Sequence, residues 1–356
     1  MPRVLHVVQS GDRGGVQRHV HDLALGLSGQ TCGVVTGSEG WLSHTVQEVG
    51  IPARALRHLQ RSLDPRGVAL ARRELTAACD DLSPQVLHAH GIFALLAALP
   101  LADRLPLVYT AHGFQWHDEA HPWGVRRLSL QLHRLAARKV SAFIAVASEG
   151  DEARRVGFQR VERIPNGVAL PEAGAGLADT NTFGVATRLV PGKGLVEALA
   201  ILAADPGLRL LVAGDGPLRR TLEEQADSLG VGGRVDFLGW QDDLNAFYGS
   251  TFAYVSLSHK EGLPYGVLDA LAAGLPVVLS DIPGHRELVE HGRNGFLVAH
   301  GDAKAAGQAL QRLSSDRSFR AAAGAASREF VRTRYALAPM LERHATLYTE
   351  LGGAVR

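Results

Sequence analysis

The sequence predicts an α/β protein made of two doubly wound units. Short apolar, β-rich runs alternate with longer stretches of helical periodicity, a pattern typical of parallel strands joined by crossover helices. The chain has 356 residues, enough for two domains of roughly 150 to 200 residues each. The Gly-, Ala- and Pro-rich stretch at 170–180 lacks apolar periodicity and is the best linker candidate. We therefore expect one domain over 1–170 and a second over 171–337.

Ten apolar runs are predicted to be strands, five in each half of the chain. They cover 4–8, 32–36, 85–89, 107–111 and 142–147 in the first half, and 182–187, 209–214, 234–239, 252–257 and 276–280 in the second. The last periodic stretch, over about 338–356, predicts a helix that could pack back on the first domain or on the second.

Composition is typical of a globular protein in a reducing compartment. Hydrophobic residues make up 46% of the chain and charged residues 21%. The two cysteines, Cys32 and Cys79, form no CxxC pair or disulfide framework. The longest apolar run, 91–102, falls short of the roughly 20 residues of a membrane span, and the N-terminus lacks the pattern of a signal peptide. We expect a cytoplasmic protein.

Positive charge is concentrated in the first half of the chain. Residues 1–170 contain 19 Lys and Arg against 15 Asp and Glu, and eleven of the sixteen histidines. A basic helix predicted over 123–140, which begins with Trp123, could lie on an anionic membrane surface at the inner face of the membrane. An ordinary solvated helix face is the alternative. No basic motif interleaved with aromatic residues indicates nucleic-acid binding.

Glycines follow the first predicted strand at the start of a helix. Gly14 and Gly15 would let the backbone approach a ligand closely, and the helix N-terminus offers unpaired N–H groups to an anion. A phosphate contact is one interpretation. An ordinary strand-to-helix turn is the other, because the loop matches neither GxGxxG nor GxxxxGK[ST].

In the second half, four successive strands are each followed by a candidate ligand loop. Arg188 and Lys193 lie in TRLVPGKGL (187–195), and AGDGPL (213–218), FLGW (237–240) and EGLPYGVLDA (261–270) follow the next three strands. The carboxyl ends of parallel strands share one edge of a sheet, where ligands bind. Two cations there suit a diphosphate, although a solvated loop pair remains the alternative.

Two carboxylates, Glu261 and Asp269, stand eight positions apart in the fourth of these loops. Burying an isolated carboxylate is costly unless partners compensate. If a helix begins near Pro264, Glu261 lies in the loop ahead of it and Asp269 about a turn and a half inside. They would then contact two parts of one ligand, or serve as a capping carboxylate and a hydrogen-bonded buried Asp.

Histidines in the first half raise the question of a metal. His112 follows a strand end, which fits a proton-handling or polar substrate contact, or a structural histidine. His88 and His90, with His112, His117 and His121 further along, have no Cys, Asp or Glu partner at a standard ligand spacing. We therefore predict no metal site.

Taken together and in order, these motifs resemble one family across nearly the whole chain. The motifs are GGVQRHV (14–20), YTAHG (109–113), RIPNGV (163–168), TRLVPGKG (187–194), AGDGPL (213–218), RVDFLGW (234–240) and the stretch from EGLPYG to NGFLV (261–298). They are similar to those of retaining GT-B glycosyltransferases of family 4, also called glycosyl transferases group 1. The resemblance implies two facing Rossmann-like domains with a deep interdomain cleft.

The resemblance also implies roles for particular residues. The C-terminal domain would hold a nucleotide sugar and the N-terminal domain an acceptor. Arg188 and Lys193 would neutralise the donor diphosphate, helped by the backbone N–H at Gly15 beside Gly14. Glu261 would bind the sugar hydroxyls, Asp269 the ribose hydroxyls, and the backbone at Trp240 the base. His112 would lie near the transferred sugar and the attacking hydroxyl. Gly262 and Leu263 would lie in the nucleotide-sugar site beside Glu261.

The implied reaction is transfer of a sugar from a nucleotide diphosphate, of UDP or GDP type, to an acceptor hydroxyl. The family usually needs no cofactor or divalent metal, since its own cations stabilise the departing diphosphate. Retention would follow front-face attack through an oxocarbenium-like transition state. A carbohydrate or lipid-linked acceptor, in surface polysaccharide or glycolipid assembly, is the expectation from family habit.

The chain departs from the family pattern in three places. Asp269 stands where the family has a second glutamate, Pro264 in Gly-Leu-Pro-Tyr-Gly cannot donate an N–H, and Ala169 stands where an Asp is common. Two other functions remain open: a sugar-nucleotide epimerase or hydrolase of the same architecture, and a non-catalytic sugar-nucleotide binder.

Overall fold

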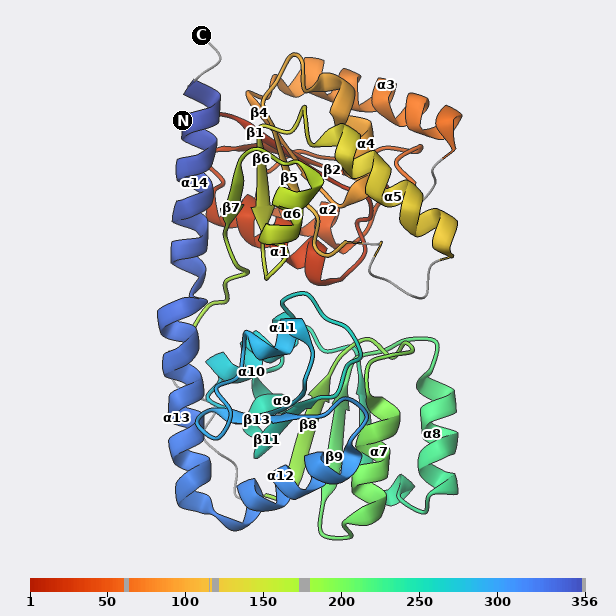
Figure 1. Cartoon of the computed structure of the whole chain (residues 1–356), viewed down its shortest axis with the longest axis vertical. Coiled ribbons are helices and arrows are strands. Elements are labelled where there is room, and N and C mark those ends of the chain that lie inside the picture. Colours follow the sequence, from red (N-terminus) through yellow and green to blue (C-terminus); the bar gives the residue numbers. More distant parts are fainter. Residues whose placement is uncertain (61–63, 115, 117–121, 173–179, 354–356) are drawn as a thin grey trace. The chain divides into compact units, whose positions relative to one another are not determined.

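A computed structural model describes residues 1–60, 64–114, 116, 122–172 and 180–353 (Figure 1). The chain forms two compact units. Met1–Asn166 and Pro339–Arg356 make up the first, and Gly167–Ala338 make up the second. Most of the predicted linker, at 173–179, lies outside the described residues, as do His117 and His121.

The first unit is a seven-stranded parallel sheet with helices on both faces (Figure 1). The strand order is β3-β2-β1-β4-β5-β6-β7, which is the doubly wound arrangement. The strands are β1 (Val4–Val8), β2 (Thr31–Thr36), β3 (Ala53–Ala55), β4 (Val86–His90), β5 (Leu107–Thr110), β6 (Ala142–Ala145) and β7 (Val161–Arg163). The helices are α1 (Gly15–Gly26), α2 (Trp41–Glu48), α3 (Pro65–Leu82), α4 (Ile92–Ala98), α5 (Trp123–Ala136) and α6 (Gly150–Val156), with the 3-10 helix η1 (Leu99–Leu101).

Side-chain alternation along the central strands separates two faces of this sheet. Leu5 and Val7 of β1 pack into the large apolar core beneath α3 and α4, together with Leu87 and Ala89 of β4. The alternate position His6 is fully buried on the other face. Central strands of a parallel sheet are usually apolar along their whole length because both faces are buried, and the buried histidines are exceptions to this apolar pattern.

The second unit is a six-stranded parallel sheet of order β10-β9-β8-β11-β12-β13. Its strands are β8 (Thr182–Ala186), β9 (Arg209–Ala213), β10 (Val235–Gly239), β11 (Ala253–Ser256), β12 (Val277–Ser280) and β13 (Gly295–Val298). Its helices are α7 (Leu195–Ala204), α8 (Arg219–Ser228), α9 (Asn245–Gly249), α10 (Tyr265–Ala272), α11 (Pro283–Arg286), α12 (Ala303–Ser315) and α13 (Arg317–Arg334), with the 3-10 helix η3 (Gly232–Arg234).

The last helix, α14 (Leu337–Gly353), packs against the first unit from Pro339 onward. Its Tyr348 hydroxyl lies 2.7 Å from Nδ1 of His88 in β4. Near its end, Gly352 leaves no room for a side chain, because an added Cβ would lie 2.4 Å from Cβ of Pro2. The chain therefore returns to its first sheet after completing the second.

All ten predicted strands are present, each within two residues of its expected bounds at either end. Three further strands were not predicted: β3, β7 and β13. Each pairs with a single neighbour at a sheet edge and has only three or four residues. Such short edge strands are hard to see in a sequence because the adjacent strand and its turn determine them.

No helix in the described part of the chain is both long enough and apolar enough to cross a membrane.

Candidate functional site

Two loops at the carboxyl edge of the second sheet bring Lys193 and Glu261 together. Lys193 lies between β8 and α7, and Glu261 lies between β11 and α10. Lys193 Nζ is 2.6 Å from Glu261 Oε1, and the side chains are only 21% and 16% exposed. The predicted proximity of these loops is therefore observed as a largely buried ion pair.

Glycine allows the two loops to approach this closely. Gly194 has φ +73°, and a Cβ added there would lie 2.4 Å from the carbonyl carbon of Leu257. The backbone N–H of His259 donates to the Gly192 carbonyl over 2.9 Å. These contacts hold the Lys193 loop against the segment that leads to Glu261.

Pro264 is the residue immediately before α10, as expected, and Asp269 is the fifth residue of this helix. The Asp269 side chain is half-buried. The phenol of Tyr254 in β11 is electrostatically influenced by both carboxylates. Its buried hydroxyl donates to the Ala186 carbonyl over 2.9 Å, and burial raises its pKa, with Glu261 and Asp269 raising it further through their charge. Both carboxylates therefore lie near one buried phenol.

The backbone between the carboxylates is partly accessible. Gly262 is exposed and Leu263 is buried. Gly284 at the start of α11 packs against this backbone, because a Cβ added there would lie 2.0 Å from the Gly262 carbonyl oxygen. No residue with a side chain could take its place without moving the loop.

His285 is a member of this site that sequence reasoning missed. It is fully buried in α11, where Nδ1 donates to the Ser280 carbonyl over 3.0 Å and Nε2 lies 3.3 Å from Ser256 Oγ. Burial lowers the pKa of His285; Glu261 opposes this effect and Lys193 adds to it. His285 therefore lies within electrostatic reach of the ion pair as a neutral imidazole. Its position just after a strand end was the available signal.

Arg188 lies in the same β8–α7 loop and is exposed. The neighbouring residues are held by the loop after β9: Leu189 N–H donates to the Asp215 carbonyl over 2.9 Å. A Cβ added at Gly214 would lie 1.9 Å from the Thr187 carbonyl oxygen. The AGDGPL glycines thus support the Arg188 loop by close backbone approach.

Trp240 is the predicted site residue that lies furthest along the sheet. It follows β10, which β9 and β8 separate from β11, and it is 48% exposed. Its indole N–H donates to Asp242 over 3.1 Å. An exposed ring at the outer edge suits contact with a flat group.

In the first unit, Gly14 and Gly15 stand at the start of α1 as expected. Gly14 precedes the helix in extended backbone, and no side chain caps the helix N-terminus. A Cβ at Gly14 would lie 2.7 Å from Oε1 of Gln17. Uncapped N–H groups at a twelve-residue helix are available to an anion.

His112 belongs to a cluster of six histidines that the sequence did not reveal. The six are His6, His19, His88, His90, His112 and His344, which come from β1, α1, β4, the loop after β5, and α14. All are buried except His112, which is half-buried and has φ +55°, an unusual value for a residue with a side chain. Sequence separation hid the cluster, because only folding brings these elements together.

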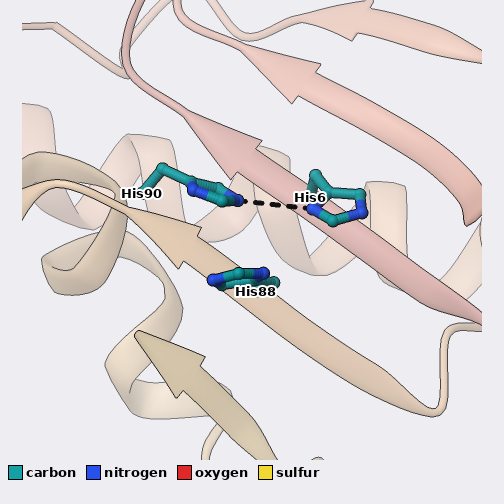
Figure 2. Close-up of side chains that lie close together, drawn as sticks. All are labelled: His6, His88 and His90. Carbon is teal, nitrogen blue, oxygen red and sulfur yellow. Dashed lines mark hydrogen bonds between the residues drawn. The ribbon is translucent and has the colours of Figure 1, made fainter. Parts of the chain in front are cut away.

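Two triads within the cluster are compact enough to hold a metal by distance alone. His6, His88 and His90 form one (Figure 2), and His19, His90 and His112 form the other. In each triad the candidate nitrogen atoms lie within 4.8 Å of one another. Ligand spacing along the sequence predicted no metal site, because the members of each triad come from more than one element and meet only in the folded chain.

Comparison with known proteins identifies the family. The models for Glycosyltransferase Family 4 and Glycosyl transferases group 1 match residues 13–171 and 175–330. A GDP-mannose:cellobiosyl-diphosphopolyprenol alpha-mannosyltransferase of Xanthomonas oryzae pv. oryzae is 31% identical over 299 residues, covering 79% of this chain and 76% of that protein. The chain belongs to glycosyltransferase family 4.

Other relatives agree with this assignment. This family 4 glycosyltransferase is 28% identical over 313 residues to the putative glycosyltransferase EpsD of Bacillus subtilis, covering 79% of each chain. The solved structure of HepE from Anabaena in complex with UDP-glucose matches with a TM-score of 0.85 at 22% identity, over 99% of this chain and all of that one. The predicted GT-B fold, with two Rossmann-like domains, is thereby confirmed.

Proposed function

We propose that this glycosyltransferase moves a sugar, with retention and without a divalent metal, from a nucleoside-diphosphate sugar to an acceptor hydroxyl. The second unit binds the donor and the first unit binds the acceptor. The observation that carries the proposal is the largely buried ion pair of Lys193 and Glu261 at the carboxyl edge of the second sheet, where the loop that carries Lys193 also carries Arg188.

The charges at this edge suit a departing diphosphate. Arg188 and Lys193 carry two positive charges on one loop, and Glu261 neutralises one of them in the absence of a ligand. As the glycosidic bond breaks, negative charge grows on the diphosphate, and fixed cations in a partly dry site stabilise it. No divalent metal is needed for this step. Glu261 remains available to accept hydrogen bonds from sugar hydroxyls.

The remaining donor contacts that we propose are those that the family resemblance implies. Asp269, inside α10, accepts hydrogen bonds from the ribose hydroxyls, and the backbone of Gly262 and Leu263 lies between the sugar and the ribose. Trp240 contributes to binding of the base. Gly14 and Gly15 at α1 supply N–H groups to an anion, and His112 contacts the reacting sugar.

The proposal is tested by transfer and hydrolysis assays on a panel of UDP- and GDP-sugars, chosen by thermal shift. A ligand that binds only the folded protein raises its melting temperature. Glu261→Gln, with its shape nearly unchanged, should lower turnover at least about a hundredfold while leaving the fold intact. Glu224→Gln, at an exposed position of α8, is the matched charge control. Full activity in Glu261→Gln contradicts the assignment.

The names of relatives guide the choice of donor and acceptor. The Xanthomonas relative is named for GDP-mannose and a diphosphopolyprenol-linked acceptor, and the Anabaena structure contains UDP-glucose. We propose a lipid-linked or carbohydrate acceptor, in surface polysaccharide or glycolipid assembly, for a protein that works in the cytoplasm.

Helix α5 supports peripheral contact with a membrane that carries such an acceptor. Its large apolar side chains are unusually exposed: Trp123 by 70%, Leu128 by 46% and Leu135 by 68%. Leu128 and Leu135 lie seven residues apart and so share one helix face, and the guanidinium of Arg127 lies 5.2 Å from the centre of the Trp123 ring. Apolar and cationic groups together favour an anionic interface.

Vesicle sedimentation tests this contact. Vesicles with 30% phosphatidylglycerol should retain the protein, and phosphatidylcholine alone should retain much less. Leu128→Glu with Leu135→Glu should abolish retention without altering turnover of a soluble acceptor. Equal retention of this variant rules out α5 as the contact.

A further inference from the structure

Three histidines of the first unit form a head-to-tail hydrogen-bonded chain. His6 Nδ1 lies 3.3 Å from His90 Nε2 (Figure 2), and His90 Nδ1 lies 3.2 Å from His112 Nε2. His6 comes from β1, His90 from the end of neighbouring β4, and His112 from the loop after β5. Adjacent parallel strands therefore supply successive members of the chain.

All three imidazoles are neutral near pH 7. Burial, and then the charge that His344 would carry, lower the pKa of His6 and of His112 to about 3. Burial and the neighbouring His88 hold the pKa of His90 well below its usual value. A neutral imidazole has one N–H donor and one acceptor nitrogen. The chain can therefore run in only two directions.

The inner end of the chain favours one direction. His6 Nε2 is buried and has no hydrogen-bond partner among the described residues. If the protons ran from His112 toward His6, this atom would be a buried N–H without an acceptor. If they run from His6 toward His112, it is a bare lone pair. Orphaned buried donors are rarer in proteins than under-satisfied acceptors, so the second direction is favoured.

A metal ion is the competing explanation, and the hydrogen bonds disfavour it. His90 belongs to both candidate triads, but its two nitrogens are already engaged by His6 and His112. In the triad with His6, both nitrogens of His88 lie near hydroxyls: Nδ1 is 2.7 Å from Tyr348 and Nε2 is 2.8 Å from Thr110. Both nitrogens of His88 and both nitrogens of His90 are thus engaged without an ion.

We propose that His6 and His90 are positioning residues that hold His112 as its Nδ1–H tautomer. His6 Nδ1–H donates to His90 Nε2, and His90 Nδ1–H donates to His112 Nε2. Only Nδ1 of His112 is then left for a ligand, and the described residues give this atom no hydrogen-bond partner.

The consequence for the reaction rests on the proposed function. His112 donates a hydrogen bond to an oxygen of the reacting sugar or its phosphate, and it does not remove the proton of the acceptor hydroxyl. The left-handed backbone of His112 is consistent with a ring held in one orientation by its surroundings. The acceptor proton must then go to another group, such as the departing phosphate.

Nitrogen-15 NMR of histidine side chains in the full-length, ligand-free protein tests the proposal directly. Two-bond nitrogen–proton correlations distinguish the Nδ1–H from the Nε2–H tautomer, and single-histidine variants assign the signals. We expect the Nδ1–H form for His6, His90 and His112 at pH 7. An Nε2–H or doubly protonated His112 overturns the proposal. This readout needs no substrate, so it is independent of whether the protein transfers sugar.

Two variants of His6, the innermost residue of the chain, then distinguish the effect of its N–H donor from the effect of its side-chain packing. His6→Asn keeps an N–H donor near the Nδ1 position, whereas His6→Leu removes it. His6→Leu should give a mixture of His112 tautomers and lower kcat about tenfold with little change in donor KM, and His6→Asn should restore both. An unchanged His112 tautomer in His6→Leu overturns the proposal; if that variant does not fold, the wild-type spectrum decides.

A buried histidine elsewhere in the unit is the matched control. His133 bonds to the Ser129 carbonyl and to Tyr109, and burial lowers its pKa to about 4. His133→Gln should leave the His112 tautomer as in the wild type. Addition of one equivalent of zinc should not shift the chain signals; tight stoichiometric binding with such shifts establishes the metal site and overturns the hydrogen-bonded chain.

Discussion

Replacing Lys193 with methionine should weaken both the fold and donor binding, by amounts that the ion pair allows us to estimate. The pair spans 2.6 Å with side chains 21% and 16% exposed, between the surface case and the fully buried case. Exposed pairs contribute up to about 1 kcal/mol, and losing one partner of a buried pair costs about 3 to 5 kcal/mol. We expect Lys193→Met to lower the free energy of unfolding by about 2 kcal/mol, measured by urea denaturation.

The effect on ligand binding should depend on the phosphates. A charge-assisted hydrogen bond contributes about 1.5 to 3 kcal/mol, so the Kd for UDP or GDP should rise roughly 10- to 150-fold. Binding of the matching nucleoside, which lacks phosphate, should change little. Titration calorimetry with each pair of ligands measures the difference, and Lys304→Met is the control for lost charge. Equal losses for nucleotide and nucleoside, or none for either, refute the diphosphate role.

Three further predictions concern the fold around both sites. Gly194→Ala should abolish donor binding and destabilise the protein by more than the roughly 1 kcal/mol that a left-handed backbone costs an alanine, because the added Cβ would also clash with Leu257. Gly230→Ala is the control in thermal melts: Gly230 has φ +70° but open space around it, so this variant shows the backbone cost alone. Tyr348→Phe should cost about 1 to 3 kcal/mol in urea, since it removes the hydroxyl next to His88. The free energy of unfolding should fall as the pH drops from about 6.5 toward 4, by about 1.4 kcal/mol per pH unit for each buried histidine of the cluster. The reason is that these histidines bind protons in the unfolded chain and do not bind them in the folded chain. A free energy of unfolding that stays constant across this pH range in denaturation experiments contradicts this prediction.

The sign of this pH effect follows from the direction of the pKa shifts. The folded pKa of His6 and of His112 is lowered to about 3 and that of His344 to about 4. Their stabilising contribution is therefore complete above the unfolded value near 6.5 and is lost as the pH falls through the window down to the folded values. His6→Asn should reduce the slope of the free energy of unfolding against pH by about 1.4 kcal/mol per pH unit, which corresponds to one proton.

Sequence patterns predicted the interior strands, which are buried on both sides, and one five-residue edge strand, β10. Runs such as 107–111 and 276–280 are continuous and apolar because a central parallel strand has no solvent face. The edge strands β3, β7 and β13 escaped prediction because a single neighbour and few residues define them. The folding of α14 onto the first sheet also depends on contacts, such as that of Tyr348 with His88, that no local pattern encodes.

The candidate site divides in a similar way. Lys193 and Glu261 were predictable because each follows a strand end, and strand ends of a parallel sheet meet at one edge. His285 was missed although it too follows a strand, because it lies in a polar stretch beside Arg286 and Glu287, where nothing in the sequence indicates that its side chain is buried. The six-histidine cluster combines residues from both ends of the chain, so it became visible only in three dimensions.

The most direct test of the central claim is the anomeric configuration of the product formed from an α-linked nucleoside-diphosphate sugar in the presence of a chelator. The donor is the sugar nucleotide from the UDP and GDP panel that stabilises the protein most. We predict an α-linked product by NMR at an undiminished rate in EDTA, and at least about a hundredfold slower formation in Glu261→Gln. A β-linked product, complete loss of activity in EDTA, or full activity in Glu261→Gln would contradict the account.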